Sequence, residues 1–395
     1  MIKLIKNTFY KENETKSHLC AFIKKTQQLS IGPECRKFEE RFAKYQGRKH
    51  CIFFNSGSSA NLAIIQALLN LDRIKCNDIA AFSALTWATN PMPLIQLGLK
   101  AIPLDVEINT LNVSSKQLRK IIQRYRLKLL FITNLLGFCS DIDEIKKICQ
   151  KNHILLIEDN CESLGTVYKG TKLGNFGLAS TFSFFVGHHM STIEGGAVCT
   201  DDSDVALMLK LVRAHGWDRN LAPVHQINLR KEYKVASTFY SKYTFYDLGY
   251  NLRPTEINGF IANYQLKFID VIIKKRERNF LYLAKHIYRQ PQKYYPMDYS
   301  HLDVVSNFAF PVICKTPKIR NELIKKCENE VEIRPIVGGD MTRQPFFKKY
   351  MPEFSEILGN SNAKLINENG LYFGNNPELT YNEIKKIIRI FNPIK

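Results

Sequence analysis

The feature that most constrains the fold is a regular alternation of short apolar runs with longer segments of helical character between residues 51 and 159. The segments at 60–69, before 125 and at 141–151 carry apolar residues at helical spacing, and each lies between two runs that suit buried strands. Strands that alternate with helices pair in parallel, so we expect a doubly wound, mainly parallel sheet with its site beyond the carboxyl ends of the strands. The apolar runs are 51–54, 79–82, 101–105, 129–133 and 154–159.

Length and composition fit a large globular protein. The 395 residues are 45% apolar, which is ample for a large core or two domains. No window has the roughly 18 to 20 apolar residues of a membrane span, and the apolar start is too short for a secretory signal. We therefore expect a cytoplasmic protein with no membrane partner.

The net charge of +19 is compatible with nucleic acid, an anionic membrane surface or an acidic small substrate. No nucleic-acid motif accompanies the lysines, so we expect no nucleic-acid partner. The basic run at 274–278 is interpreted as a solvated helix face. The ten cysteines are dispersed without a Cys-x-x-Cys pair, which predicts reduced thiols and no metal site.

The stretch from Thr181 to Gly196 combines a strand, two adjacent histidines and a glycine turn. The run 180–186 suits a buried strand that Gly187 ends, so His188 and the histidine after it fall on a turn where they can approach a ligand. The alternative for these residues alone is a hairpin with two polar surface histidines.

A second turn, at 55–59, follows the first strand and opens the apolar segment 60–69. A strand, a Gly-Ser turn and a helix together offer free backbone N–H groups and the positive end of a helix dipole to a phosphate. Gly57 and Ser58 are the candidates for such a cup, and an ordinary capped helix is the alternative. Trp87, at the end of the next strand, is either a core residue or a surface on which a flat ring could stack.

Five segments carry a resemblance, in this order along the chain: 55–61, 158–163, 213–220, 249–254 and 334–337. They resemble one family, the pyridoxal phosphate (PLP) dependent nucleotide-sugar aminotransferases and dehydratases. The resemblance implies PLP fold type I, the fold of aspartate aminotransferase, and it covers roughly residues 30 to 340. We accordingly expect a lead-in and large PLP-binding domain over 1–270 and a smaller C-terminal α+β domain over 271–395.

His188 stands eight residues before Gly196, where the aminotransferases of this family carry the lysine that binds PLP covalently. That bond needs a primary amine, so an imidazole leaves the cofactor held non-covalently and places a base at the catalytic position. Within the family this resembles the sugar 3-dehydratases, especially those that act on GDP-4-keto-6-deoxymannose. An imidazole with a pKa near neutrality would suit both proton abstraction and protonation of a departing hydroxyl.

The resemblance implies a lyase that removes the C3 hydroxyl of a nucleotide-linked 4-keto-6-deoxyhexose. Pyridoxamine phosphate (PMP) would be regenerated from glutamate, and the 3,6-dideoxy product would enter surface-polysaccharide biosynthesis such as that of O-antigen. The absence of cysteines between 199 and 314 argues against the iron–sulfur cluster of the related CDP-sugar enzyme. Whether the nucleotide is GDP or CDP stays open. A sugar aminotransferase with non-covalent PLP and an inactive regulatory homologue are the alternatives.

The resemblance also assigns the remaining site residues. Asp159 would pair with the protonated pyridine nitrogen, although an acid after a strand could equally cap a helix. Asn251 would reach the cofactor phosphate of a partner subunit, which implies a homodimer with shared sites. For His215 a structural role is as plausible as a role in the site. The expected cofactor-binding residues are Gly57, Ser58, Trp87, Asp159, Glu162, Ser183 and Asn251, and the expected substrate-binding residues are His215, Arg219, Arg253 and Arg334.

Overall fold

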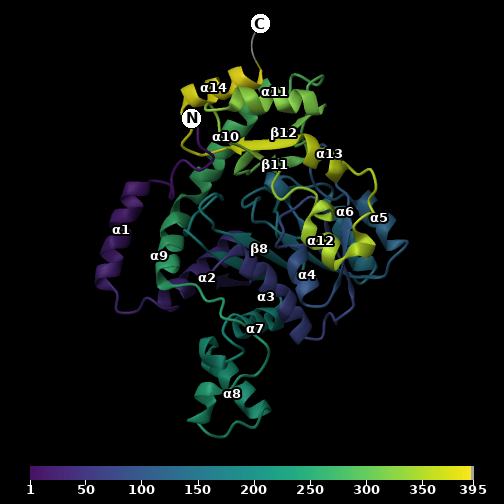
Figure 1. The fold of residues 1–395 in the computed structure, drawn as a ribbon. Helices are drawn as coiled ribbons and strands as arrows, with labels where there is room; N and C mark the ends of the chain where they lie inside the picture. The colour runs from purple at the N-terminus through teal and green to yellow at the C-terminus, as the bar shows by residue number, and fades with distance from the viewer. Residues whose placement is uncertain (393–395) are drawn as a thin grey trace.

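A seven-stranded sheet forms the centre of the molecule in the computed structural model, which describes residues 1–392 (Figure 1). Its spatial order is β1-β9-β8-β5-β4-β2-β3. Within this sheet β9 pairs antiparallel with β1 and β8, and the remaining pairings are parallel. The predicted mainly parallel sheet is therefore confirmed. The strands are β1 His50–Phe54, β2 Ile79–Ser83, β3 Lys100–Leu104, β4 Leu127–Thr133, β5 Leu155–Asp159, β8 Ala179–Ser183 and β9 Gly196–Thr200.

Helices cover both faces of this sheet because both faces of its strands are apolar. In β1, Ile52 and Phe54 pack with α3 and α7, whereas Cys51 and Phe53 pack on the other side with α2. Alternate strand residues point to opposite faces, so one apolar run supplies two cores. The helices around the sheet are α2 Pro33–Gln46, α3 Gly57–Asn70, α4 Pro91–Gln96, α5 Ser115–Ile122, α6 Ile142–Lys151 and α7 Ser203–Val212.

The strand predicted over 180–186 is shorter than expected, because β8 ends at Ser183. Pairing with β9 stops at Ser183 opposite Gly196, and the Phe184 N–H then donates to the carbonyl of Gly195. The chain turns after that bond, and residues 185–190 form an irregular loop. His188 therefore lies on a turn, as predicted, five residues beyond the strand end.

The later part of the chain forms a four-stranded antiparallel sheet with helices against it, at the top of Figure 1. Residues of both sheets, such as Leu130 and Phe310, belong to one continuous core. The smaller α+β part is thus confirmed, and its boundary at residue 270, near the start of α10, stays a prediction. The elements are α10 Ile269–Ile287, β10 Tyr294–Tyr295, β12 Ala309–Cys314, α11 Pro317–Cys327, β13 Ile333–Pro335, α12 Pro345–Tyr350, α13 Asn362–Asn369, β14 Gly370–Gly374 and α14 Tyr381–Phe391.

A small third sheet joins the two parts, because β11 (Leu302–Val304) pairs with β6 (Val167–Tyr168), which pairs with β7 (Thr171–Lys172). The first residues are also tied to the later part. The Ile2 N–H donates to the carbonyl of Glu330, and the Ile2 carbonyl accepts the N–H of Glu332. Segments far apart in the sequence therefore meet beside the central sheet.

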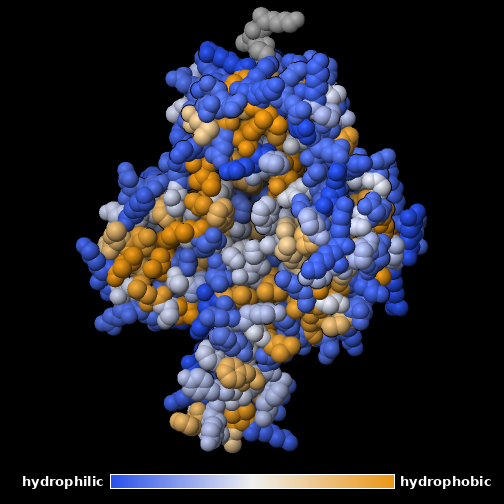
Figure 2. All heavy atoms as spheres, in the orientation of Figure 1, coloured by the Kyte–Doolittle hydropathy of each residue, from blue (hydrophilic) through white to orange (hydrophobic). Residues whose placement is uncertain are grey.

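Residues 216–248 form a lobe that protrudes from the body, at the bottom of Figure 1. It contains α8 (Pro223–Glu232), which has no buried residue, and several large apolar side chains on its surface, visible in Figure 2. The most exposed are Phe239, Tyr240, Tyr243 and Leu248. Across residues 1–392, none of the helices combines the length and the apolar character that crossing a bilayer requires.

One buried carboxylate connects the helical lead-in to the body. α2 begins beside α9 (Glu256–Gln265), and α1 (Glu12–Lys25) lies against α9 on its outer side. The Glu256 side chain accepts the backbone N–H groups of Gly32, Glu34 and Cys35 at 2.7, 2.8 and 3.0 Å. These donors include N–H groups of the first turn of α2, which have no partner within the helix.

We predict that Glu256→Ala lowers the free energy of unfolding by about 3 to 5 kcal/mol, because it leaves three backbone donors unpaired in a buried place. Urea unfolding followed by circular dichroism measures this change. Glu40→Ala is the matched control, since Glu40 lies on the exposed face of α2 and should change the value by less than about 0.5 kcal/mol. Equal effects of the two substitutions would contradict this account of α2.

Candidate active site

A cavity of about 350 Å³ opens where β4, β5 and β8 end and α3 begins. The parallel strands deliver their carboxyl ends to one edge of the sheet, as the alternation predicted. The structure brings seven of the predicted residues together in its wall, although their roles stay predictions. They are Gly57, Ser58, Trp87, Asp159, Glu162, Ser183 and His188.

One end of the cavity is suited to a phosphate. Ser56 caps α3 by accepting the Ser59 N–H at 3.0 Å, and the first backbone N–H groups of the helix lie beside Gly57 and Ser58. Residue 57 has to be glycine, because a Cβ atom there would lie 2.6 Å from the Cβ of Ser183. The serine at the end of β8 is therefore in contact with the start of the helix, where free N–H groups and the helix dipole favour an anion.

Asp159 presents a carboxylate that neutral groups hold in place. Its Oδ2 accepts amide N–H groups of Asn61 and Asn90 at 3.0 and 2.9 Å, and its Oδ1 accepts the Cys161 N–H at 2.9 Å. Within residues 1–392 it makes no salt bridge. A carboxylate oriented this way can pair with a cationic ring nitrogen of a ligand.

Trp87 supplies a flat apolar surface to the same cavity. Its side chain is 55% exposed, which is unusual for the largest aromatic residue, and its backbone is fixed because the Asn90 N–H donates to its carbonyl at 3.1 Å. An exposed ring on the wall of a cavity favours stacking with a ligand ring over a core role. Phosphate cup, carboxylate and stacking surface together fit the size and chemistry of a pyridoxal phosphate.

His188 faces the cavity from the loop after β8. Its ring packs edge-on against Phe308 with centroids 5.3 Å apart, and Phe185 lies at 6.0 Å on another side. Burial lowers the pKa of His188 to about 4, even though the nearby Asp159 carboxylate acts in the opposite direction. The expectation of a pKa near neutrality is therefore wrong for this structure, because apolar rings take the place of water around the imidazole. At neutral pH the side chain is a neutral base.

Glu162 is a buried carboxyl group on the same wall. Its Oε2 accepts the N–H of Leu136 at 3.0 Å, a residue with a left-handed backbone (φ 51°). Burial raises the pKa of Glu162 to about 8, and the neighbouring Asp159 adds to this shift. At neutral pH most of the Glu162 side chains are protonated, and a protonated carboxyl can donate a hydrogen bond to a ligand.

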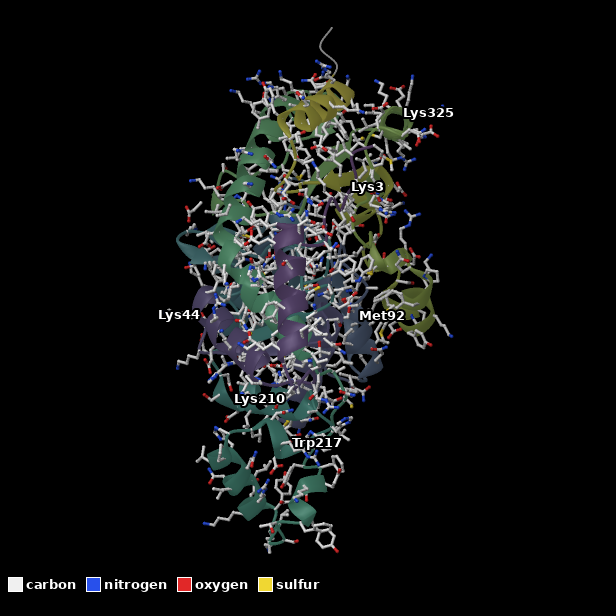
Figure 3. All side chains as sticks on the ribbon, turned by 90° about the vertical axis from the view of Figure 1, so that its left-hand side faces the viewer. Lys3, Lys44, Met92, Lys210, Trp217 and Lys325 are labelled. Carbon is white, nitrogen blue, oxygen red and sulfur yellow. The ribbon has the colours of Figure 1, made fainter. Side chains whose placement is uncertain are left out.

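Four predicted residues lie outside this cavity, where the lobe joins the body. His215 lies edge-on to Trp217 at 5.1 Å, and the guanidinium groups of Arg219 and Arg253 lie 4.2 and 5.8 Å from the same indole. Figure 3 shows Trp217 at this junction. Asn251 accepts a hydrogen bond from Arg253 at 2.9 Å. The structure thus brings these residues together as a second group.

The fifth, Arg334, is exposed on β13 and pairs with Glu332. Its strand partner is Tyr372, whose side chain lines the cavity. Arg334 therefore lies on the strand next to a residue of the cavity wall, without lining the cavity itself.

Sequence reasoning missed several residues in the wall or directly behind it. Asn61 and Asn90 hold Asp159, and both lie close to predicted residues, so their positions next to the glycine turn and Trp87 were available signals. The wall also includes residues from both ends of the chain, namely Leu4, Ile5, Phe308 and Tyr372. No sequence signal places these residues there, because their positions depend on packing between distant segments.

The protonated state of Glu162 predicts a pH dependence of stability in the protein without cofactor. The folded pKa of about 8 exceeds the ordinary value of 4.5, so the folded state binds more protons between these values. This proton binding contributes stability that is fully present below pH 4.5 and is lost as the pH rises through 8. The stability lost in this way amounts to a few kcal/mol. Glu162→Gln keeps an acceptor for the Leu136 N–H and has no carboxyl group to ionise, so we expect it to avoid this loss.

Urea unfolding of both proteins from pH 5 to pH 9 measures the difference. The stability of the wild type should fall relative to that of Glu162→Gln over this range. Two curves that remain parallel would show that Glu162 is ionised in the folded protein.

Comparison with known proteins identifies the family to which this chain belongs. Residues 10–392 match the DegT/DnrJ/EryC1/StrS aminotransferase family. The chain is 34% identical over 370 residues to GDP-4-keto-6-deoxy-D-mannose 3-dehydratase of Escherichia coli O55:H7, and the match covers 91% of this chain and 92% of that protein.

Two solved structures agree over nearly the whole chain. A histidine-to-asparagine variant of GDP-4-keto-6-deoxymannose 3-dehydratase with bound GDP-perosamine is 30% identical, with a TM-score of 0.87 over 99% of this chain and 100% of that one. A 3-dehydratase of the same name with a trapped PLP-glutamate geminal diamine is also 30% identical, with a TM-score of 0.86 over the same shares. The fold and the sequence agree that this chain belongs to the DegT/DnrJ/EryC1/StrS aminotransferase family.

Proposed function

We propose that this protein is a PLP/PMP-dependent 3-dehydratase that converts GDP-4-keto-6-deoxymannose into its 3,6-dideoxy-4-keto product, with glutamate as the co-substrate. The observation that carries the proposal is His188, an imidazole in the wall of a cavity that otherwise fits a PLP-type cofactor. The similar 3-dehydratases support the substrate, and the solved relatives contain a GDP-sugar in one case and PLP with glutamate in the other.

The cofactor would be held by groups already in place. The start of α3 with Ser183 would bind its phosphate, Trp87 would stack on its ring, and Asp159 would pair with its ring nitrogen. When bound, PMP would supply a primary amine for the C4 ketone of the sugar and a ring that takes up the electron pair released by proton removal and returns it to expel the C3 hydroxyl.

His188 would move the protons, and Glu162 would act as a hydrogen-bond donor. The Nδ1 atom of His188 is buried and has no partner among the described residues, so the proton transfers fall to Nε2. A neutral imidazole can accept a proton in the cavity and then deliver it to the departing C3 hydroxyl oxygen. Glu162, protonated at neutral pH, can donate a hydrogen bond to the cofactor. Because residue 188 has no primary amine, the enzyme has no covalent route to displace an aminated product.

The overall reaction balances as one keto sugar and one glutamate giving one 3-deoxy keto sugar, one 2-oxoglutarate and one ammonia. An aminotransferase would give 2-oxoglutarate and an amino sugar without ammonia. The ratio of ammonia to 2-oxoglutarate therefore separates the two enzyme classes, and binding of PMP separates both from an inactive homologue.

We expect the purified protein with PLP, glutamate and GDP-4-keto-6-deoxymannose to release ammonia and a nucleotide sugar lighter by one oxygen atom. His188→Asn should lower this rate by about 10² to 10⁴-fold, because it removes the proton-transfer group. His188→Lys should also lose ammonia release. The matched control is His153→Asn, an exposed site whose left-handed backbone (φ 54°) tolerates asparagine.

Mass spectrometry of the sugar and an enzymatic ammonia assay report the outcome. An aminated sugar from the wild type would establish the aminotransferase instead. An unchanged sugar despite bound PMP would point to another nucleotide sugar.

We further propose that the protein is a homodimer in which the lobe junction of one subunit completes the cavity of the other. Asn251, Arg219 and Arg253 lie outside their own cavity, and the adjoining lobe has exposed aromatic side chains. Surfaces of this kind mark protein interaction sites.

Subunit complementation tests this arrangement. His188→Asn and Asn251→Ala should each be inactive alone, whereas refolding an equal mixture should restore about a quarter of the wild-type sites, because the mixed dimer contains one intact site. Light scattering should show a dimer. A monomeric enzyme, or a mixture without activity, would contradict the shared site.

A further inference from the structure

Arg276 is a buried cation in a helix whose basic run was expected to face solvent. Its side chain is 4% exposed, because the residue lies on the inward stripe of α10 together with Ile272, Ile273 and Phe280. Arg278, two residues later, lies on the exposed side. The interpretation of 274–278 as a solvated face is therefore wrong for Arg276.

The guanidinium group of Arg276 donates to three backbone carbonyl groups from different segments. Nη1 donates to the carbonyls of Phe308 at 3.1 Å and Asn375 at 2.5 Å, and Nη2 donates to the carbonyl of His188 at 3.1 Å. The Asn375 amide in turn donates to the Arg276 carbonyl at 2.9 Å. One side chain thus joins the loop after β8, the start of β12 and the end of β14.

Two of these carbonyls belong to residues of the cavity wall. Phe308 provides the ring against which the His188 imidazole packs, at 5.3 Å between centroids. Arg276 therefore links the backbone of His188, which carries the imidazole, to the backbone of Phe308, which carries the ring beside it. The distance and the angle between the two rings depend on this bridge.

The guanidinium charge has no acidic partner. Among the described residues no carboxylate lies within 4.0 Å of it, and burial lowers the pKa of Arg276 to about 9. Burying an unpaired charge is costly, and an apolar side chain of similar length would fill the space without that cost. What an arginine adds here is the set of directed bonds that its planar group can make.

We propose that Arg276 is a positioning residue for His188, because its guanidinium group fixes the backbone of the imidazole and of the ring against which the imidazole packs. The proposal rests on the proton-transfer role proposed above for His188. The positive charge of Arg276 also disfavours protonation of the His188 imidazole.

Other groups that face the imidazole act on it as well, and they remain in place when Arg276 is changed. They are Asp159 at the end of β5, Cys161 and Glu162 just after it, the neighbouring His189, Glu194 before β9, Tyr372 from β14, and Tyr10 and Glu378 on the other side of the loop. A change in the titration of His188 on substitution of Arg276 alone can therefore be assigned to that residue.

The test compares Arg276→Met and Arg276→Lys with Arg278→Met, which removes the same charge from the exposed side of the same helix. Histidine side-chain NMR of the protein without cofactor follows the titration of His188, identified as the signal absent from His188→Asn among the nine histidines. Steady-state kinetics of the loaded enzyme give kcat and KM. Thermal unfolding confirms that each variant is folded.

Arg276→Met should raise the pKa of His188 and lower kcat by about 10 to 100-fold, with KM within about threefold. Arg276→Lys should keep the pKa nearer that of the wild type and still lose kcat, because an ammonium group cannot bridge three carbonyls in a plane. Arg278→Met should change neither quantity.

A folded Arg276→Met with wild-type titration and kcat would overturn the proposal. If that variant does not fold, wild-type values in Arg276→Lys would overturn it instead. The NMR titration does not require dehydratase activity, so failure of the proposed function and failure of this inference give different results.

Discussion

The arrangement of the site depends on the hydrogen bonds that the Asp159 carboxylate accepts. Three neutral N–H donors satisfy its oxygens, and none of them brings a positive charge. The donors come from α3, from the loop before α4 and from the residue two after Asp159, so one side chain aligns three segments. A ligand that carries a cationic ring nitrogen completes the pairing that the protein leaves open.

The same burial that shapes the cavity shifts two titratable groups in it toward their uncharged forms. His188 stays neutral at pH values well below its ordinary pKa, and Glu162 stays protonated at pH values well above its ordinary pKa. Desolvation is the main cause in both cases, because it disfavours whichever form is charged. The result is a neutral base and a neutral acid on one wall at neutral pH. Environments that move two titratable groups apart in this way are typical of acid–base sites.

Much of the fold and about half of the site could be predicted from the sequence, for reasons that particular residues make clear. The alternating apolar runs specify the parallel sheet, and that sheet places Asp159, Ser183 and the turn at Gly57 at one edge. Local patterns therefore located at least one residue of the site after each of β1, β2, β5 and β8.

The remaining parts depend on long-range packing. Arg276 shares the helical stripe of Ile272, Ile273 and Phe280, which is a signal that the charge pattern obscured. The carbonyls that hold it come from residues 188, 308 and 375, and no local rule brings those together. The pKa of His188 could not be predicted either, because the burial that lowers it comes in part from Phe308, which is distant in the sequence.

The connection of Ile2 to residues 330 and 332 has a consequence for the order of assembly. The seven strands of the central sheet lie within residues 50–200, so that sheet can form while the chain is still being synthesised. Leu4 and Ile5, although made first, can take their place in the cavity wall only after residue 332 has emerged. Contacts that span so much of the sequence form slowly. The cavity is therefore a late product of biosynthesis, completed when residues 2–5 meet the segment at 330–332.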